Sequence, residues 1–178
     1  RTTITTPYAL TSPVVVTRGV SQGTILPNIS VSGVTIVVSG NHTSTEFYVG
    51  ERYSMTYEFS EPTLKEPTAT GGRVAITGGR LQIKHWLLRY QDSGDFTVKI
   101  QQKGSSTSKD YVFTGFVVGD GTSTLGANAL TSGDFKFPVM SKADRIRVII
   151  ESNSHLPCQF LSAEWEGNMH LRSRRVNG

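Results

Sequence analysis

The sequence predicts an all-β fold, an antiparallel β-sandwich or barrel-like domain of about eight to nine strands. Segment after segment alternates apolar and polar residues with period two, the pattern of a strand with one buried face. Turn-forming residues, including 18 glycines, separate these segments. No stretch of about ten residues has the apolar period of an amphipathic helix. At 178 residues the chain is long enough to bury a core of its own.

The clearest strand is expected where Tyr53, Met55, Tyr57 and Phe59 alternate with polar residues, and these four side chains are expected on its buried face. Other segments show the same alternation over shorter or less regular stretches. Further strands are therefore expected at residues 14–17, 30–39, 81–90, 96–101, 111–118, 134–139, 145–151 and 158–166.

Several local features interrupt this pattern. The alternation changes phase within residues 81–90, which indicates a β-bulge near His85 or burial of both faces. Pro138 cannot donate a backbone hydrogen bond, so it is expected at the end of its strand or on an edge strand. Residues 61–79 are rich in proline and glycine and are expected to form a large surface loop or the boundary between two parts of the domain. At most a short helical turn is expected within residues 123–130.

The charge distribution points to the end of the sequence. The formal net charge is +4, and Arg172, Arg174 and Arg175 lie close together near the last residue. A basic segment of this kind contacts nucleic acid, anionic lipid or an acidic protein surface, and a run this short is typical of a solvated terminus or of a salt-bridge donor between subunits. No signal peptide is expected, and no apolar run is long enough for a membrane-spanning helix.

Residues with catalytic or metal-binding chemistry are sparse. The histidines are far apart in the sequence and Cys158 is the single cysteine, so neither a metal nor another cofactor is expected. Glu164 and Glu166 flank Trp165, and on a strand they would project from one face about 7 Å apart. That spacing suits the acid pair of a glycosidase, but it is also the ordinary polar face of a strand. We expect no enzyme, with the glycosidase as the alternative to test.

The second half of the chain carries the segments that suggest a family. They are residues 49–53, 57–60, 79–83, 92–96, 135–139 and 156–160, followed by Ser162–Gly167 and Arg172–Arg175. From about residue 48 to residue 176 the chain resembles the C-terminal part of the tail tubular protein B family, the nozzle proteins of short-tailed bacteriophages. The closing segments, with the sequences SAEWEG and RSRR, are the most specific part of this resemblance.

The resemblance implies a structural component of a phage tail, assembled in the host cytoplasm and present in the virion. Its partners would be other copies of the chain in a ring of six, other tail proteins, and genomic DNA in transit. Members of this family are several times longer than this chain. We expect residues 48–178 to form the β-sandwich domain. Residues 1–47 are expected to contribute N-terminal strands, either to the same domain or as a separate piece.

Trp86, Trp165 and the arginines Arg172, Arg174 and Arg175 are the candidate interface residues. Aromatic and arginine side chains anchor many protein interfaces. A tube that passes DNA must not hold it tightly, so we expect these arginines to face a neighbouring protein and not the bore. The alternative function is a carbohydrate-binding β-sandwich, in which Trp86, Trp165 and Tyr90 would stack on sugars.

Overall fold

The computed structural model describes the chain except residues 19–22, 77, 116–129 and 172–178. The regular structure of the described residues is antiparallel β-strand with one 3-10 turn, η1 (Ala143–Arg145), which confirms the all-β prediction. The structure contains 15 strands in the described residues, more than the expected number. The additional strands are mostly two to five residues long, too short to produce a clear alternation in sequence.

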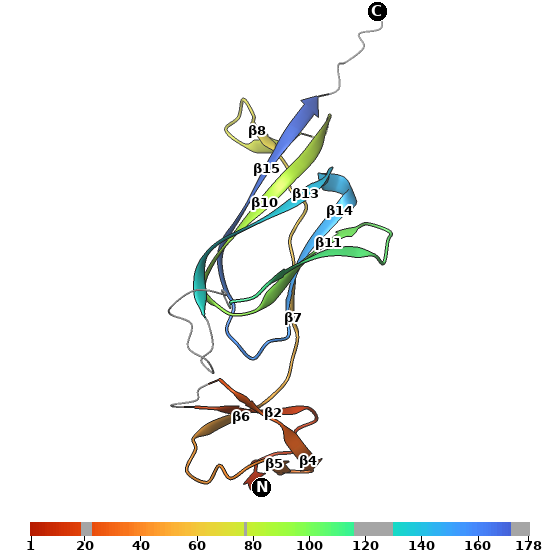
Figure 1. Ribbon diagram of the computed structural model, residues 1–178. Coiled ribbons are helices and arrows are strands. Elements are labelled where there is room, and N and C mark those ends of the chain that lie inside the picture. Colours follow the sequence, from red (N-terminus) through yellow and green to blue (C-terminus); the bar gives the residue numbers. More distant parts are fainter. Residues whose placement is uncertain (19–22, 77, 116–129, 172–178) are drawn as a thin grey trace, which may run out of the picture.

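Two sheets pack face to face as a β-sandwich (Figure 1). The four-stranded sheet has the order β12-β11-β14-β7, with β12 (Ser108–Phe113), β11 (Phe96–Gln102), β14 (Ile146–Ser152) and β7 (Met55–Glu58). The three-stranded sheet has the order β13-β10-β15, with β13 (Thr131–Lys142), β10 (Gly79–Ser93) and β15 (Gln159–Leu171). Every neighbouring pair in these sheets is antiparallel.

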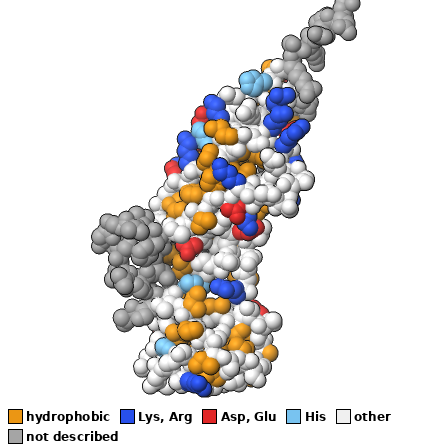
Figure 2. Space-filling model, turned by 45° about the vertical axis from the view of Figure 1, so that its right-hand side comes forward, with side chains coloured by type: hydrophobic (Ala, Val, Ile, Leu, Met, Phe, Trp, Pro, Cys, Tyr) orange, Lys and Arg blue, Asp and Glu red, His pale blue; other side chains and the backbone are white. Residues whose placement is uncertain are grey.

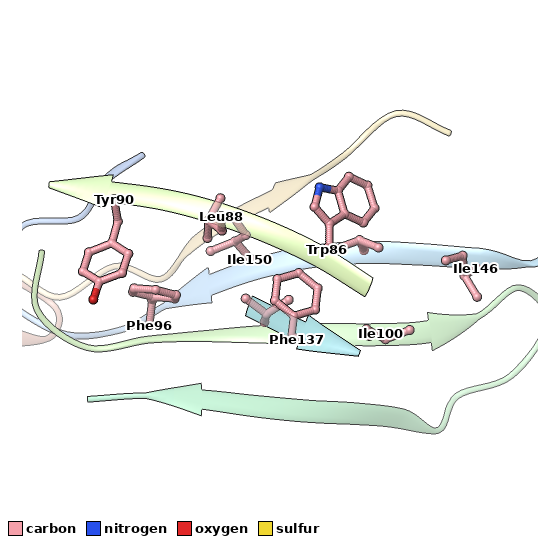
Figure 3. Packing of buried hydrophobic residues seen from close by; sticks show 10 residues of the cluster. Trp86, Leu88, Tyr90, Phe96, Ile100, Phe137, Ile146 and Ile150 are labelled. Carbon is pink, nitrogen blue, oxygen red and sulfur yellow. The ribbon is translucent and has the colours of Figure 1, made fainter. Parts of the chain in front are cut away.

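The core of the sandwich is an aromatic and aliphatic cluster in which Phe96 has a central place. Its ring lies 4.5 Å from that of Phe113, 5.2 Å from that of Phe160 and 5.7 Å from that of Tyr90, measured between centroids. Figure 3 shows labelled side chains of β10, β11, β13 and β14 gathered between the strands. The alternation expected in residues 96–101 and 145–151 is confirmed, because Val98, Ile100, Val148 and Ile150 with their neighbours form this core.

The two sides of the sandwich differ. Between the edge strands β12 and β13, the Tyr111 hydroxyl donates to the Pro138 carbonyl at 2.8 Å, and the rings of Phe113 and Phe135 lie 5.5 Å apart. Pro138 lies on β13, which is an edge strand of its sheet. This confirms one of the two positions expected for this proline, the end of its strand or an edge strand. Between the other edge strands, β7 and β15, the structure shows a groove instead of a closed seam.

The edge position of β7 explains one error. The strand covers only Met55–Glu58. Met55 and Phe59 pack against the core, as expected. Tyr53, however, is 80% exposed, and Tyr57 also lies at the surface. The expectation that all four alternating residues are buried is therefore wrong for the two tyrosines. Alternation identifies one face of a strand, but the facing sheet does not cover that whole face at an open edge.

The long strand β10 contains the bulge expected near His85. Its pairing with both neighbours shifts between Ile83 and His85, which places Ile83 and Trp86 on the same buried side. Gly167 of β15 lies opposite Ile83. A Cβ atom at Gly167 would collide with the Gln82 carbonyl oxygen and would lie 3.2 Å from the Ile83 Cα, so the close approach of β15 at the bulge requires glycine.

The N-terminal sheets form a second layered unit, which Figure 1 shows below the sandwich. One has the order β1-β5-β4, with β1 (Thr2–Thr5), β5 (Thr35–Val38) and β4 (Asn28–Ser32). The other has the order β3-β2-β6, with β3 (Ile25–Leu26), β2 (Pro13–Thr17) and β6 (Phe47–Glu51). They enclose a core of Ile4, Val15, Leu26, Ile36 and Val38. His155 Nε2 lies 2.7 Å from the Gly23 carbonyl oxygen and links this unit to the sandwich.

Two further sequence expectations need correction. Residues 30–39 are not one strand but part of the hairpin β4–β5, which turns at Gly33, where φ is +58°. Residues 61–79 are not wholly irregular, because they contain the hairpin of β8 (Lys65–Pro67) and β9 (Arg73–Ala75). The helical turn expected at residues 123–130 falls on residues outside the described part, except Leu130.

Replacing Gly167 by alanine is expected to destabilise the fold by about 1–3 kcal/mol, because the added methyl group forces β15 away from the bulge. Chemical denaturation monitored by tryptophan fluorescence measures this change. Gly50→Ala on β6 is the matched control, because a Cβ atom there meets no neighbouring atom within 4 Å. Equal stability of the two variants would contradict the steric explanation.

Candidate assembly surface

Trp86 and Trp165 are direct partners in the pairing of β10 with β15, so their side chains project from the same face of the sheet. That face is the inner one. Trp86 is 4% exposed and packs against Phe59, with the ring centroids 5.2 Å apart, while Trp165 packs at the margin of the same core. In the described chain the two residues serve packing, and their role at an interface stays a prediction.

The sugar-stacking alternative depends on the same inner face. Tyr90 is buried beside Phe96 and Phe113, on the same side as Trp86. A ring that stacks on a sugar presents one face to solvent. Trp86 and Tyr90 do not present such a face in this structure.

The outer face of the three-stranded sheet carries Glu164 and Glu166. His85 Nε2 lies 2.8 Å from Glu166 Oε2. The hydrogen bond with Asp134 raises the pKa of Arg89, and the charge of Glu164 adds to this increase. Arg89 Nε also donates to Asp134 Oδ1 at 2.9 Å across the β10–β13 pair. The two glutamates thus belong to a network of charged side chains that spans all three strands of this sheet. This arrangement fits the polar face of a sheet, the second of the two interpretations of their spacing.

Cross-strand ion pairs change the pKa of several carboxyl groups. The hydrogen bond from Arg89 lowers the pKa of Asp134, and the hydrogen bond from Arg147 lowers the pKa of Glu58. The Arg147–Glu58 pair has two hydrogen bonds, one of them from Nε to Oε1 at 2.7 Å, and it joins β14 to the edge strand β7. These pairs are solvent-exposed and help to set strand register more than they add stability.

Basic side chains surround a hollow of about 520 Å³ at one end of the sandwich. Arg80, Lys142, Arg145 and Lys103 line it, with Asp144 as the one carboxylate in its lining. Lys103 Nζ also lies 2.7 Å from Glu61 Oε2. Figure 2 shows several Lys and Arg side chains toward the upper end of the molecule.

The three arginines that the sequence analysis gave as candidate interface residues come directly after β15 in the sequence. Strand β15 ends at Leu171, which pairs with Gly79. Arg172, Arg174 and Arg175 come next in the sequence and lie outside the described residues. Arg80, Lys142 and Arg145 are scattered in the sequence, and only the tertiary structure brings them together, so the sequence alone did not reveal this hollow.

The groove between β7 and β15 is a second surface that the sequence did not reveal. It has a volume of about 460 Å³. Met55, Tyr57 and Phe59 lie on one side, Phe160, Leu161 and Ala163 on the other, and Leu88 and Ile150 of the core close its floor. Exposed apolar surface of this kind, at two unpaired strand edges, is typical of a site for another protein segment.

Comparison with known proteins identifies the family. The sequence profile described as bacteriophage nozzle protein matches residues 1–176. The chain belongs to the bacteriophage nozzle protein family. The resemblance found in the second half of the sequence is thereby confirmed, and the match extends through the N-terminal strands, which the resemblance did not cover.

The nozzle family match agrees with similarity to a curated protein. Over 139 residues the chain is 30% identical to the tail tubular protein gp12 of Escherichia phage T7. This alignment covers 78% of the chain but 17% of that relative's length. Membership of the nozzle family implies a structural role in the phage tail, and hence a place in the virion.

The described residues contain no group of three or more histidine, cysteine, aspartate or glutamate side chains placed to hold a metal ion. Within the same residues, no helix is long and apolar enough to cross a membrane.

Replacing Glu58 by glutamine is expected to destabilise the fold near neutral pH and to have a smaller effect near pH 3. The folded-state pKa of Glu58 lies below its ordinary value of 4.5, so its carboxylate contributes stability above that pH and loses it as the pH falls further. Urea denaturation at both pH values measures the difference. Glu66→Gln on the exposed hairpin β8–β9 is the control, and an equal loss for Glu58→Gln at both pH values would contradict the assignment.

Proposed function

We propose that this chain is a structural part of the phage tail nozzle, the tube through which the genome leaves the virion, and that it acts by assembling with copies of itself. The observation that carries the proposal is the nozzle family match over residues 1–176. The ring of six, the other tail proteins and the passing DNA are parts of the same proposal.

The surface chemistry supports a subunit that assembles. The outer faces of both sheets carry cross-strand ion pairs, namely Arg89–Asp134 and Lys99–Glu151 as well as Arg147–Glu58. A polar rim of this kind around apolar patches is typical of protein interfaces. The groove between β7 and β15 supplies such an apolar patch. A role in guiding DNA needs no tight phosphate binding, which would slow passage of the genome.

Labelling on virions tests this function. An epitope tag fused at the end of the nozzle protein that contains this chain is expected to direct gold particles to the tail, below the portal end, in electron micrographs of intact phage. The same tag on a capsid protein is the control, and it is expected to label the head. Infectious tagged particles without label on their tails would contradict the proposal.

Replacing Arg172, Arg174 and Arg175 together by alanine is expected to weaken assembly or incorporation into the tail, because they face a neighbouring protein in the proposed arrangement. Quantitative blotting of purified particles measures incorporation. The control is the triple replacement Lys65→Ala, Arg73→Ala and Lys136→Ala, which removes the same charge from other exposed positions. Normal assembly with altered DNA release would instead place the arginines toward the bore.

A further inference from the structure

We propose that the basic end of the sandwich binds an acidic segment of another tail protein, one that carries apolar side chains beside its carboxylates. This inference rests on the proposed function and deepens it, because it states the kind of partner that joins the nozzle subunit here. It is carried by a trough, which we define as the hollow lined by Arg80, Lys142 and Arg145 together with a second hollow beside it.

The trough consists of two hollows that share part of their lining. The hollow described above has a volume of about 520 Å³, and its neighbour has a volume of about 500 Å³. Four charged residues line both hollows, namely Arg80, Lys142, Asp144 and Arg145. They come from the start of β10, the end of β13 and the turn η1, which the fold brings to one end of the sandwich. Charged side chains therefore lie where the two hollows meet.

The charges of the trough do not balance. Its cations that have no ion-pair partner in the part of the chain that the structure describes are Arg80, Lys142 and Arg145. Lys103 differs from them, because its Nζ atom lies 2.7 Å from Glu61 Oε2. Three free cations beside the one free carboxylate of Asp144 leave two positive charges in excess. A segment with at least two carboxylates complements this charge.

The second hollow adds an apolar wall to these cations. Leu64, Ile76, Leu81 and Met169 line it, and each of them is half-buried, so part of each side chain reaches solvent. Met169 lies against β10 because residue 79 is glycine, since a Cβ atom there would collide with the methyl carbon of Met169. Apolar side chains beside unpaired cations form a mixed surface, which suits a protein segment that carries both kinds of side chain.

The lining of the trough favours a protein segment over nucleic acid. Asp144 and Glu61 place carboxylates in the trough, and carboxylates repel phosphate groups. The three free cations supply few of the phosphate contacts on which DNA affinity depends. Among the described residues that line the trough there is no aromatic side chain on which a base could stack. A protein segment therefore matches both the charged and the apolar parts of the lining, whereas DNA matches one of them.

A second copy of this chain suits the trough less well than a different protein. Most carboxylates of the described chain outside the trough already have partners within the same copy. Those in ion pairs include Glu58, Asp134, Glu151 and Glu166. Glu51 and Asp95 accept hydrogen bonds from backbone N–H groups. Binding in the trough of a second copy would break such contacts, so the occupant is a segment of a different tail protein.

Peptide binding to this chain tests the chemistry of the trough. The probe is a short fluorescein-labelled peptide in which glutamate alternates with leucine, and fluorescence anisotropy measures its affinity. Replacing its glutamates by glutamine, or its leucines by serine, is expected to weaken binding by about tenfold or more, because each change removes the match to one part of the lining. Duplex DNA is the competing ligand. A probe that does not bind, or DNA that binds more tightly than the probe, would overturn the proposal.

Charge reversal in the chain tests where the probe binds. The double variant Arg80→Glu, Arg145→Glu is expected to weaken binding of the glutamate–leucine peptide by about tenfold or more. The control Arg52→Glu, Lys136→Glu changes the net charge equally at exposed positions outside the trough and is expected to bind the peptide like the wild type. Circular dichroism checks that both variants fold. Leu64→Ser alters the apolar wall without a change of charge and is also expected to weaken binding. Equal weakening by the control would assign the effect to net charge and overturn the proposal.

Suppressor genetics identifies the partner in phage. Phage that carries Arg80→Glu and Arg145→Glu is expected to lose infectivity, because the acidic segment is repelled. Selection for restored plaques is expected to yield a change from an acidic residue to lysine or arginine in a different tail protein. Suppressors that fall only in this same chain would indicate a second copy as the occupant and overturn the proposal. Full infectivity of the double variant would overturn it as well.

The outcomes separate this contact from the function on which it rests. If labelled virions carry the nozzle protein in their tails and charge reversal leaves peptide binding unchanged, the contact is wrong while the nozzle assignment stands. Virions whose tails carry no label overturn the nozzle assignment itself, whatever the peptide experiments show.

Discussion

The packing of the two sheets of the sandwich around Phe96 is the interaction on which the rest of the structure depends. Rings from β10, β12, β13 and β15 surround that side chain, so residues from both sheets meet at one point. Burying this aromatic cluster removes a large apolar surface from water and joins the two sheets. The bulge at His85 and the close approach at Gly167 keep β10 and β15 in register with it.

The same core is complete on one side and open on the other. Tyr111 and Phe113 close the seam between β12 and β13, whereas the seam between β7 and β15 leaves Leu88 and Ile150 at the floor of a groove. The apolar lining of this groove and the free edges of β7 and β15 give the sandwich a surface suited to another protein segment. Such a surface is consistent with the structural role in the phage tail that membership of the nozzle family implies.

Charge has a different part in the molecule. The exposed ion pairs link neighbouring strands and contribute specificity of pairing more than stability. Arg80, Lys142 and Arg145 concentrate positive charge at one end of the sandwich. Complementary charge guides partners and sets register, while the apolar groove offers the larger gain on contact.

The sequence by itself determined the all-β class, several of the core strands and the family. Strands such as Phe96–Gln102 and Ile146–Ser152 were predictable because every second residue is a large aliphatic or aromatic side chain. The family was predictable from the segment around Glu164, Trp165 and Glu166, whose residue order is specific even though its chemistry is not.

Only the tertiary structure decided which strand edges are free and which faces are covered. An alternation with period two indicates that a strand has one apolar and one polar face, but it does not indicate which strands are neighbours in a sheet. For that reason Trp86 lies in the core although it was a candidate for an interface, and Tyr53 is exposed, outside β7, although it continues the alternation of that strand in the sequence. The hairpin at Gly33, the basic hollow and the groove beside β7 likewise depend on residues far apart in the sequence or on a local φ angle. The physical reason is that alternation is a local property, whereas sheet order and strand edges arise from long-range pairing.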